Sequence, residues 1–259
     1  MGWKNGKRFI KRCQIKGDKM KIENKVFKDF IRKASFGGSH MSINLDFAET
    51  GIKSAVKTLD NIGLSIVELN KDAIEEYEAI GEVFIKDTRA LSTYLKTMKE
   101  DLTLTFEDEY TLKIEDENGR KIYVLLGDKI VCENVFRDEM PVLDNALKIE
   151  FIDSKNMLDQ AVKDMNMLKE NKITLNLKEN HEMHLEVGKR GESDYAMTRI
   201  ICDEAGVAKT TLGATFINLY DAIGNTFDMY LKTNMPLKVE EHTPEGITAT
   251  YFIAPVVEE

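Results

Sequence analysis

Residues 236–253 read PLKVEEHTPEGITATYFI, and they carry the clearest structural pattern in the chain. Apolar and polar residues alternate on both sides of Gly246, which predicts two half-buried strands joined by a turn. Residues 110–126 read YTLKIEDENGRKIYVLL and repeat the same order around Gly119. The two copies lie 125 to 127 residues apart, so the chain contains an internal duplication.

The duplication extends over both halves of the chain. Each half is expected to contain two helices, each followed by antiparallel strands, so that it reads β-α-β-β-β twice. The predicted helices span 26–34, 88–98, 154–168 and 210–223. The strands that follow these helices are predicted over 42–47, 102–106, 173–178 and 227–231.

This order predicts an α+β fold with two similar domains. Each domain is a duplicated β-α-β-β-β unit with its helices on one face of antiparallel sheets, because alternating strands bury only one face. The expected divisions of the chain are a basic N-terminal leader without regular structure over 1–19, an N-terminal domain over 20–126, a connecting loop over 127–145 and a C-terminal domain over 146–259.

Charge is unevenly distributed along the chain. Residues 1–19 carry seven Lys or Arg and one acid, whereas the whole chain has a net charge of −9, so residues 20–259 carry −15. The leader has three interpretations: an arm that touches nucleic acid, an unstructured extension, or sequence that precedes a natural start at Met20. Because the body is acidic, any contact with DNA must use a local basic surface.

Composition limits the compartment and the class of protein. The three cysteines are far apart and odd in number, which argues against a disulfide framework and favours a reduced cytoplasm. Nothing in the sequence resembles a membrane span, since there is no run of about 18 apolar residues.

The predicted helices carry Lys and Arg away from their apolar stripes. In the helix over 26–34, for example, Phe27, Phe30 and Ile31 share one side. A charged helix face is most often ordinary solvated surface. If all the helices lined one common space, however, these cations would bind phosphates without reading sequence. The helix over 210–223 departs from the pattern because its polar face is nearly uncharged.

The end of the chain, MPLKVEEHTPEGITATYFIAPVVEE (235–259), resembles the closing pattern of the proliferating cell nuclear antigen (PCNA) family, especially its archaeal forms. The resemblance covers residues 20–259. It implies the DNA-clamp fold, no catalytic activity and no cofactor or metal. It also implies a homotrimeric ring, nucleoid-associated in the cytoplasm of a prokaryote, that encircles double-stranded DNA as a processivity factor in replication and repair.

The resemblance places the helices around the hole of the ring. The cations expected to face DNA on this basis are Lys28, Arg32, Lys33, Arg89, Lys96, Lys99, Lys155 and Lys163. It also implies that strand 121–126 pairs with an edge strand near 183–189 of the next subunit. The interface residues expected from this pairing are Lys121, Ile122, Tyr123, Val124, His184, Leu185, Glu186 and Val187.

Partners of this family carry a short apolar peptide that enters a pocket on one face of the ring. The resemblance implies binding of DNA polymerase, the clamp loader, flap endonuclease and ligase. The pocket is expected to use Ile62, Leu64, Val135, Phe136, Met140, Pro236, Phe252, Ala254 and Pro255. Some of these apolar residues are equally compatible with a place in the core.

Other signals and functions compete with this interpretation. His181 and His184 lie three apart in a predicted strand, so they point to opposite faces and do not suggest a shared metal. Residues 206–210 lack the glycines of a phosphate-binding loop. The alternative function is a duplicated hot-dog-type acyl-thioester enzyme, although no acid or base stands out for it. A heterotrimeric or virus-encoded clamp also stays open.

Overall fold

The computed structural model describes residues 19–128 and 141–256, and it is an α+β protein. The first half contains β1 (Lys19–Glu23), α1 (Asn24–Ala34), β2 (Ile43–Ala48), β3 (Gly51–Lys57), β4 (Gly63–Asn70), β5 (Gly81–Ile85), α2 (Thr88–Leu95), β6 (Asp101–Asp108), β7 (Thr111–Asp116) and β8 (Lys121–Gly127). A short 3-10 turn, η1 (Lys71–Ala73), follows β4.

The second half has the same order. It contains β9 (Leu147–Phe151), α3 (Asn156–Leu168), β10 (Lys172–Leu177), β11 (Glu182–Gly188), β12 (Tyr195–Ile201), β13 (Ala208–Gly213), α4 (Thr215–Ala222), β14 (Phe227–Leu231), β15 (Leu237–His242) and β16 (Ile247–Ile253). The β-α-β-β-β unit therefore occurs twice in each half, as the duplication predicts.

One predicted helix is wrong in part. Residues 208–213 form strand β13, and helix α4 begins only at Thr215. Thr210 and Leu212 are buried while Thr211 is less so, and this alternation fits a strand that pairs with β10. Burial over 208–213 thus follows a period of two, and the helical period begins after these residues.

In the described residues, one pair of antiparallel strands joins the two halves of the chain. Strand β16 pairs with β4 over seven residues, from Ile247 opposite Leu69 to Ile253 opposite Gly63. This pair merges the strands into a twelve-stranded sheet with the order β1-β6-β7-β8-β5-β2-β3-β4-β16-β15-β14-β9. A second sheet has the order β12-β11-β10-β13.

The predicted edge strand over 183–189 is wrong. Strand β11 (Glu182–Gly188) lies inside the second sheet, because it pairs with β10 on one side and with β12 on the other. His184, Leu185, Glu186 and Val187 therefore have their backbones inside a sheet and cannot offer an open edge. The end strands of this sheet are β12 and β13.

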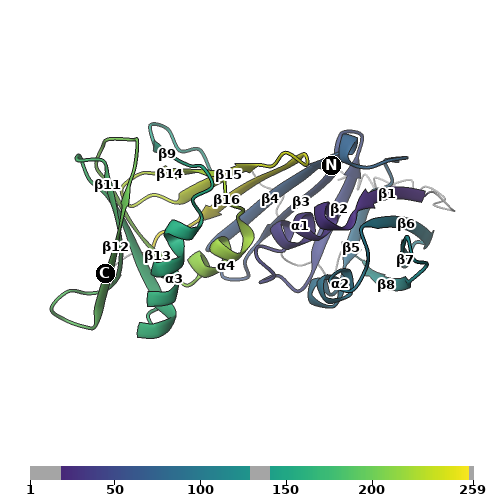
Figure 1. Cartoon of the computed structure of the whole chain (residues 1–259), viewed down its shortest axis with the longest axis horizontal. Helices are drawn as coiled ribbons and strands as arrows, with labels where there is room; N and C mark the ends of the chain where they lie inside the picture. The colour runs from purple at the N-terminus through teal and green to yellow at the C-terminus, as the bar shows by residue number, and fades with distance from the viewer. Residues whose placement is uncertain (1–18, 129–140, 257–259) are drawn as a thin grey trace, which may run out of the picture.

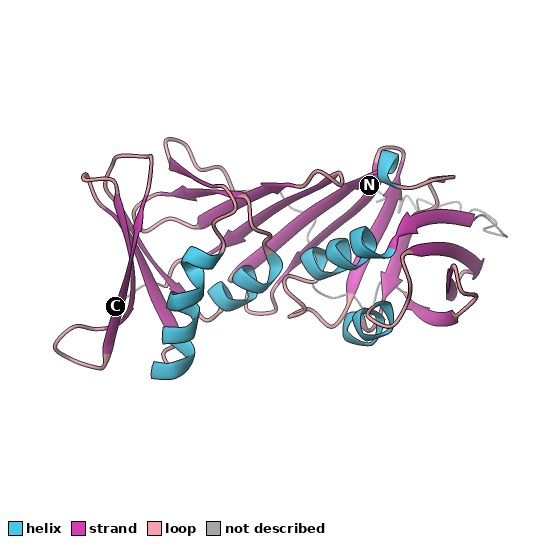
Figure 2. Ribbon diagram, in the orientation of Figure 1, coloured by secondary structure: helices cyan, strands magenta, loops and turns pink. Residues whose placement is uncertain are grey.

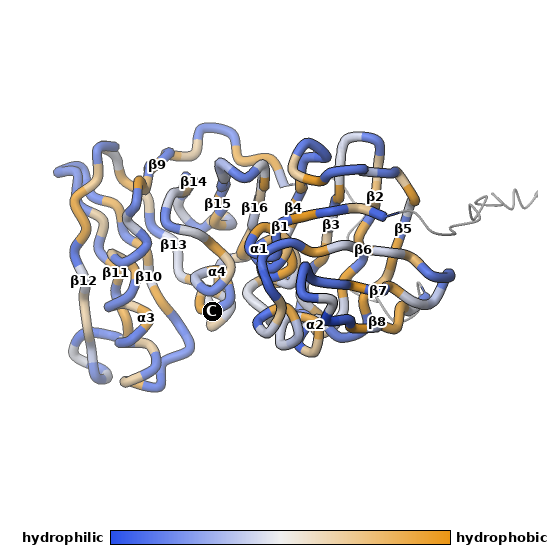
Figure 3. The backbone as a smooth tube through the Cα atoms, turned by 45° about the vertical axis from the view of Figure 1, so that its right-hand side comes forward, coloured by the Kyte–Doolittle hydropathy of each residue, from blue (hydrophilic) through white to orange (hydrophobic). Residues whose placement is uncertain are grey.

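All four helices lie in a row on one side of the strands, in the order α3, α4, α1, α2 (Figures 1 and 2). Short hydrophobic and hydrophilic stretches follow one another along the strands (Figure 3), and most strands alternate buried with more exposed residues. In residues 19–128 and 141–256, no helix has the length and apolar character needed to cross a membrane.

Candidate nucleic-acid and partner interface

The helix side of the molecule carries several exposed cations. Lys28 on α1, Arg89 on α2, Lys96 and Lys99 just after α2, and Lys163 on α3 are all exposed to solvent. They come from three of the four helices in the row (Figure 1). The structure therefore gathers five of the eight sequence-predicted cations on one side of the molecule, where they are free to meet a polyanion.

Lys33, by contrast, is fully buried, so the prediction that it faces DNA is wrong. Its Nζ lies 2.5 Å from Oε2 of Glu241 on β15 and 3.6 Å from Oδ2 of Asp29. Glu241 is 4% exposed, and its carboxylate also accepts a hydrogen bond from the amide of Gly224 at 3.1 Å. A buried cation needs such a partner, because an unpaired charge is costly to remove from water.

Arg32 and Lys155 are also engaged within the protein. The Arg32 guanidinium binds Asp29 and donates to the carbonyl oxygens of Asp221 and Ile223 at the end of α4. Lys155 donates to the same Ile223 oxygen at 2.8 Å. The last carbonyls of a helix have no partner within the helix and attract positive charge, so these two cations cap α4.

The Lys155 ammonium has a second contact, over the ring of Tyr220 at 4.5 Å. Burial lowers the pKa of Lys155, and the neighbouring Arg32 lowers it further. The Tyr220 hydroxyl donates to Asp159 on α3, and this hydrogen bond, followed by burial, raises the pKa of Tyr220 to about 12. Helices α1, α3 and α4 are thus tied together through the end of α4.

This polar cluster accounts for the absence of cations at the C-terminal end of α4. Its C-terminal end binds the cations of its neighbours, so added positive charge there would repel Arg32 and Lys155. Glu241 is the functional partner that the sequence does not reveal, since it lies 208 residues from Lys33. The one available signal is an acid, Glu241, at a position of β15 where the strand pattern predicts a buried residue.

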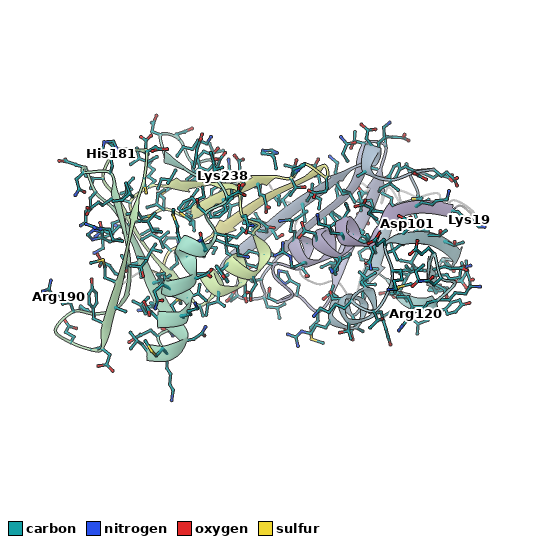
Figure 4. All side chains as sticks on the ribbon, viewed as in Figure 1. Lys19, Asp101, Arg120, His181, Arg190 and Lys238 are labelled. Atoms are coloured by element: carbon teal, nitrogen blue, oxygen red, sulfur yellow. The ribbon has the colours of Figure 1, made fainter. Side chains whose placement is uncertain are left out.

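Of the strands with an unpaired edge in the described residues, β8 and β12 lie at opposite ends of the molecule (Figure 1). Residues Lys121–Leu125 of β8 pair with β7, and pairing with β5 begins only at Leu126. In the described part of the chain, β12 pairs with β11 alone. Figure 4 shows Arg120, just before β8, and Arg190, in the turn before β12, far from each other.

Both open edges expose large side chains. On β8, Tyr123 and Leu125 are 57% and 66% exposed, and on β12, Tyr195 and Met197 are 37% and 46% exposed. Apolar side chains on an unpaired edge favour association with another strand. The open edges therefore mark two surfaces that are suited to pairing.

The described residues of the predicted peptide pocket meet where β4 begins and β16 ends. Phe252 lies opposite Leu64, and the amide of Ala254 donates to the carbonyl of Ile62 at 2.7 Å. Pro236 immediately precedes β15, and Pro255 forms an isolated antiparallel β-bridge with Leu212 of β13. Leu64 and Phe252 are 7% and 4% exposed, so the partly exposed Ile62, Pro236, Ala254 and Pro255 form the accessible part.

Three members of that predicted pocket lie outside the described residues: Val135, Phe136 and Met140. The same is true of nearly all of the basic leader and of residues 257–259.

Comparison with solved structures identifies the fold. The chain is similar to A. fulgidus PCNA bound to the C-terminal region of FEN-1, with a TM-score of 0.75, 20% identity, and coverage of 93% of this chain and 99% of that one. It is similar to PCNA from Entamoeba histolytica, with a TM-score of 0.76, 17% identity, and coverage of 92% and 98%. It is also similar to the PCNA2-PCNA3 complex from Sulfolobus tokodaii, with a TM-score of 0.69, 17% identity, and coverage of 93% and 100%.

No family model matches the sequence, and no curated protein matches it either. The likeness in structure over nearly the whole of each chain shows that the protein has the PCNA clamp fold.

Proposed function

We propose that this chain, which has the PCNA fold, is a subunit of a ring-shaped DNA sliding clamp that tethers replication and repair proteins to duplex DNA. One observation carries the proposal. Strands β4 and β16 pair with each other inside the chain. Their counterparts in the repeat are β12 and β8, and these two strands have open edges at opposite ends of the molecule. Head-to-tail contacts of this kind generate a ring when the rotation closes.

The internal junction predicts how β8 would pair between copies. In the second half, Tyr251 of β16 lies opposite Val239 of β15. In the first half, Ile122 of β8 lies opposite Ile114 of β7. Ile114 and Val239 are the same position of the repeated LKIE and LKVE segments. Ile122 is therefore the counterpart of Tyr251.

The counterpart of Ser65 on β12 follows in the same way. Ser65 of β4 lies opposite Val56 of β3, and Ala196 of β12 lies opposite Val187 of β11. β3 and β11 are the same strand of the repeat, and Val56 and Val187 each lie near its end. Ala196 is therefore the counterpart of Ser65.

Together these matches define a register between copies. Tyr251 lies opposite Ser65 within the chain, so Ile122 of one copy should lie opposite Ala196 of the next. One position further, Tyr123 of one copy should lie opposite Tyr195 of the next. Tyr123 then takes the place of Phe252, and Tyr195 takes the place of Leu64, which lie opposite each other within the chain. A cross-strand aromatic pair would give this interface stability beyond its backbone hydrogen bonds.

Closure through these edges would turn the row of helices toward a common hole. The exposed cations Lys28, Arg89, Lys96, Lys99 and Lys163 would then face the DNA backbone inside an otherwise acidic ring. Phosphate contacts of this kind carry no sequence information, and they weaken as salt rises. Encirclement would provide retention, while the weak contacts would permit sliding in a nucleoid-associated, cytoplasmic setting.

The direct test of encirclement is retention on closed DNA. The protein, loaded onto nicked circular duplex, should stay bound in high salt and leave when a single cut linearises the circle. Release from circular and linear DNA at the same rate would contradict a topological mode of binding.

The cations on the helix side are expected to contribute to binding. Replacing Lys28, Arg89, Lys96 and Lys99 with alanine removes four positive charges and should lower affinity for duplex DNA at low salt by at least 10-fold, because each lost phosphate contact reduces counterion release. The slope of log affinity against log salt concentration, measured by fluorescence anisotropy, should become shallower by up to about 3.6, because each phosphate contact contributes about 0.9.

The matched control removes four cations from the strands. Lys53, Lys57, Lys172 and Lys238 alternate with buried residues and so point away from the helices. Their replacement with alanine gives the same net charge and should leave DNA affinity within about twofold. Equal losses in the two variants would assign the effect to overall charge and remove the helix side from the DNA contact.

We also propose that partners bind through short peptides at the junction of β4 and β16. The A. fulgidus protein is bound to the C-terminal region of FEN-1, which supports flap endonuclease as one partner. DNA polymerase, clamp loader and ligase are proposed from the resemblance. The PCNA fold does not support the alternative hot-dog-type enzyme, and in this proposal the chain has no catalysis of its own.

Ile62→Glu should weaken binding of a flap-endonuclease C-terminal peptide by at least 10-fold, since a carboxylate would replace a partly exposed apolar contact at the pocket. Leu59→Glu is the control, because Leu59 is 85% exposed and lies nearby in sequence. Calorimetric titration of both variants measures the difference. Unchanged binding by the Ile62 variant would move the peptide site elsewhere.

A further inference from the structure

The twelve-stranded sheet ends in two equivalent strands, β1 and β9, but their outer edges differ. The outer edge of β1 is covered by the segment that follows η1. Lys21 donates its amide to the carbonyl of Glu75 at 2.9 Å and accepts from the Glu75 amide at 2.8 Å. This antiparallel bridge gives β1 a partner on both sides.

Glu150 of β9 occupies the place of Lys21. Across the sheet from β1, Lys21 lies opposite Thr103 of β6, and Thr103 lies opposite Glu115 of β7. Across the sheet from β9, Glu150 lies opposite Asp228 of β14, and Asp228 lies opposite Glu240 of β15. Glu115 and Glu240 are again the matching residues of the repeated LKIE and LKVE segments. The backbone of Glu150 therefore points away from β14, as that of Lys21 points away from β6.

Among the described residues, β9 forms strand pairs with β14 alone, and the link after β12 packs against the side chain of Leu147 at Gly206. The reason for the single strand partner is the length of the connection. Residues 71–80 link β4 to β5, whereas only residues 202–207 link β12 to β13. The shorter link lacks the stretch that crosses to β1 in the first half, so the edge of β9 is left open.

A cavity of about 250 Å³ lies between β9 and the end of β12. Ile149 and Phe151 form its buried wall, and Ile152 and Ile201 line it while being 68% and 66% exposed. In the covered counterpart, the segment over β1 places Ile74 against the core with 5% exposure. The open edge thus offers backbone hydrogen bonds beside a cavity of mixed lining, in which aliphatic side chains alternate with Glu150, Ser154 and Asp203 and leave room for an aliphatic side chain.

The charges at the two edges are opposite. Nζ of Lys21 lies 3.7 Å from Glu75 and 3.4 Å from Glu76 of its covering segment. The open edge instead carries the carboxylate of Glu150, and Asp203 lines the cavity as well. The neighbouring cation, Lys148, is already paired with Glu150 and Asp228 at 2.7 and 3.1 Å.

We propose that the open edge of β9 is a docking site for an extended segment of a partner protein, which carries an aliphatic residue flanked by basic residues. The segment pairs antiparallel to β9 at Glu150, as Glu75 pairs at Lys21, and its aliphatic side chain enters the cavity. Its basic side chains meet Glu150 and Asp203. The site is separate from the pocket at the junction of β4 and β16, and it does not require a ring.

The probe is the chain's own covering segment with its charge inverted. Residues 72–79 read DAIEEYEA, and the peptide DAIKKYKA replaces the three glutamates with lysines. Hydrogen exchange should slow by at least 10-fold at the amides of 147–151 when this peptide saturates the protein. The unchanged peptide should give no protection, because its carboxylates would oppose Glu150 and Asp203.

Two variants separate the contributions. Ile201→Ser should weaken the basic peptide by at least 10-fold, since it removes an aliphatic wall of the cavity without changing its charge. Glu150→Lys should reverse the preference, so that DAIEEYEA binds more tightly than DAIKKYKA, and this reversal would not follow from a merely damaged fold. Absence of protection by either peptide, or protection that appears with protein concentration alone because a second copy covers the edge, would overturn the proposal.

Discussion

Lys33→Met should lower the free energy of unfolding by about 3–5 kcal/mol, because it leaves the buried Glu241 carboxylate without its cation. The pair is 0% and 4% exposed in its side chains, so water cannot replace the lost partner. A loss of this size is a large share of the total stability of a typical domain. Urea unfolding at neutral pH measures it through the midpoint and slope of the transition.

The cost arises from the unpaired charge and not from the loss of the lysine itself. Adding Glu241→Gln to Lys33→Met should therefore recover most of the stability, since the amide oxygen can still accept from the Gly224 amide. Lys28→Met is the control on the exposed face of the same helix, and it should change stability by less than about 0.5 kcal/mol. Equal destabilisation by the single and the double variant would show that Lys33 acts through packing alone.

The second large effect is expected at the open edges. Tyr123→Asp combined with Tyr195→Asp would place two carboxylates opposite each other at every subunit contact. Each contact loses an aromatic pair and gains repulsion between two carboxylates. Together these changes should weaken the contact by about 2 kcal/mol, which is a roughly 30-fold loss of affinity. Because the proposed ring contains several such contacts, the assembly should fall apart to monomers at micromolar concentration, as measured by analytical ultracentrifugation.

Charge complementarity supplies the control for this effect. Tyr123→Lys combined with Tyr195→Asp places opposite charges at the same positions and should restore assembly. Tyr110→Asp changes a tyrosine that is 54% exposed in the turn between β6 and β7, and it should leave assembly intact. Monomers from the complementary pair, or rings from the two-aspartate variant, would place the interface on other strands.

The repeat explains why much of the fold is predictable from sequence. Alternation in residues 227–231, 236–240 and 248–253 reports which side of each strand is buried, and this requires only local periodicity. The same local signal misassigned 210–213, where a strand runs directly into helix α4 and one apolar pattern follows the other without a break.

Features that depend on distant partners were not predictable. Lys33 lies next to the apolar stripe of α1, and its burial depends on Glu241 and Gly224 from the other half of the chain. Likewise, β11 and β12 have similar alternation, and only the order of strands in the sheet shows that β12 lies at an edge and β11 does not. The cations at the ends of helices, Arg32 and Lys155, were drawn inward by the carbonyls of α4, which carry no signature in sequence.

Covalent trapping of the proposed contact between β8 and β12 tests the central claim most directly. In a background without the three native cysteines, Tyr123→Cys and Tyr195→Cys should form a disulfide between copies, because directly opposed residues on paired strands lie within bonding range. After mild oxidation, denaturing mass spectrometry should find one closed product of three chains, each of about 29.5 kDa. Uncross-linked single chains, or an open series of ever longer products, would contradict a ring.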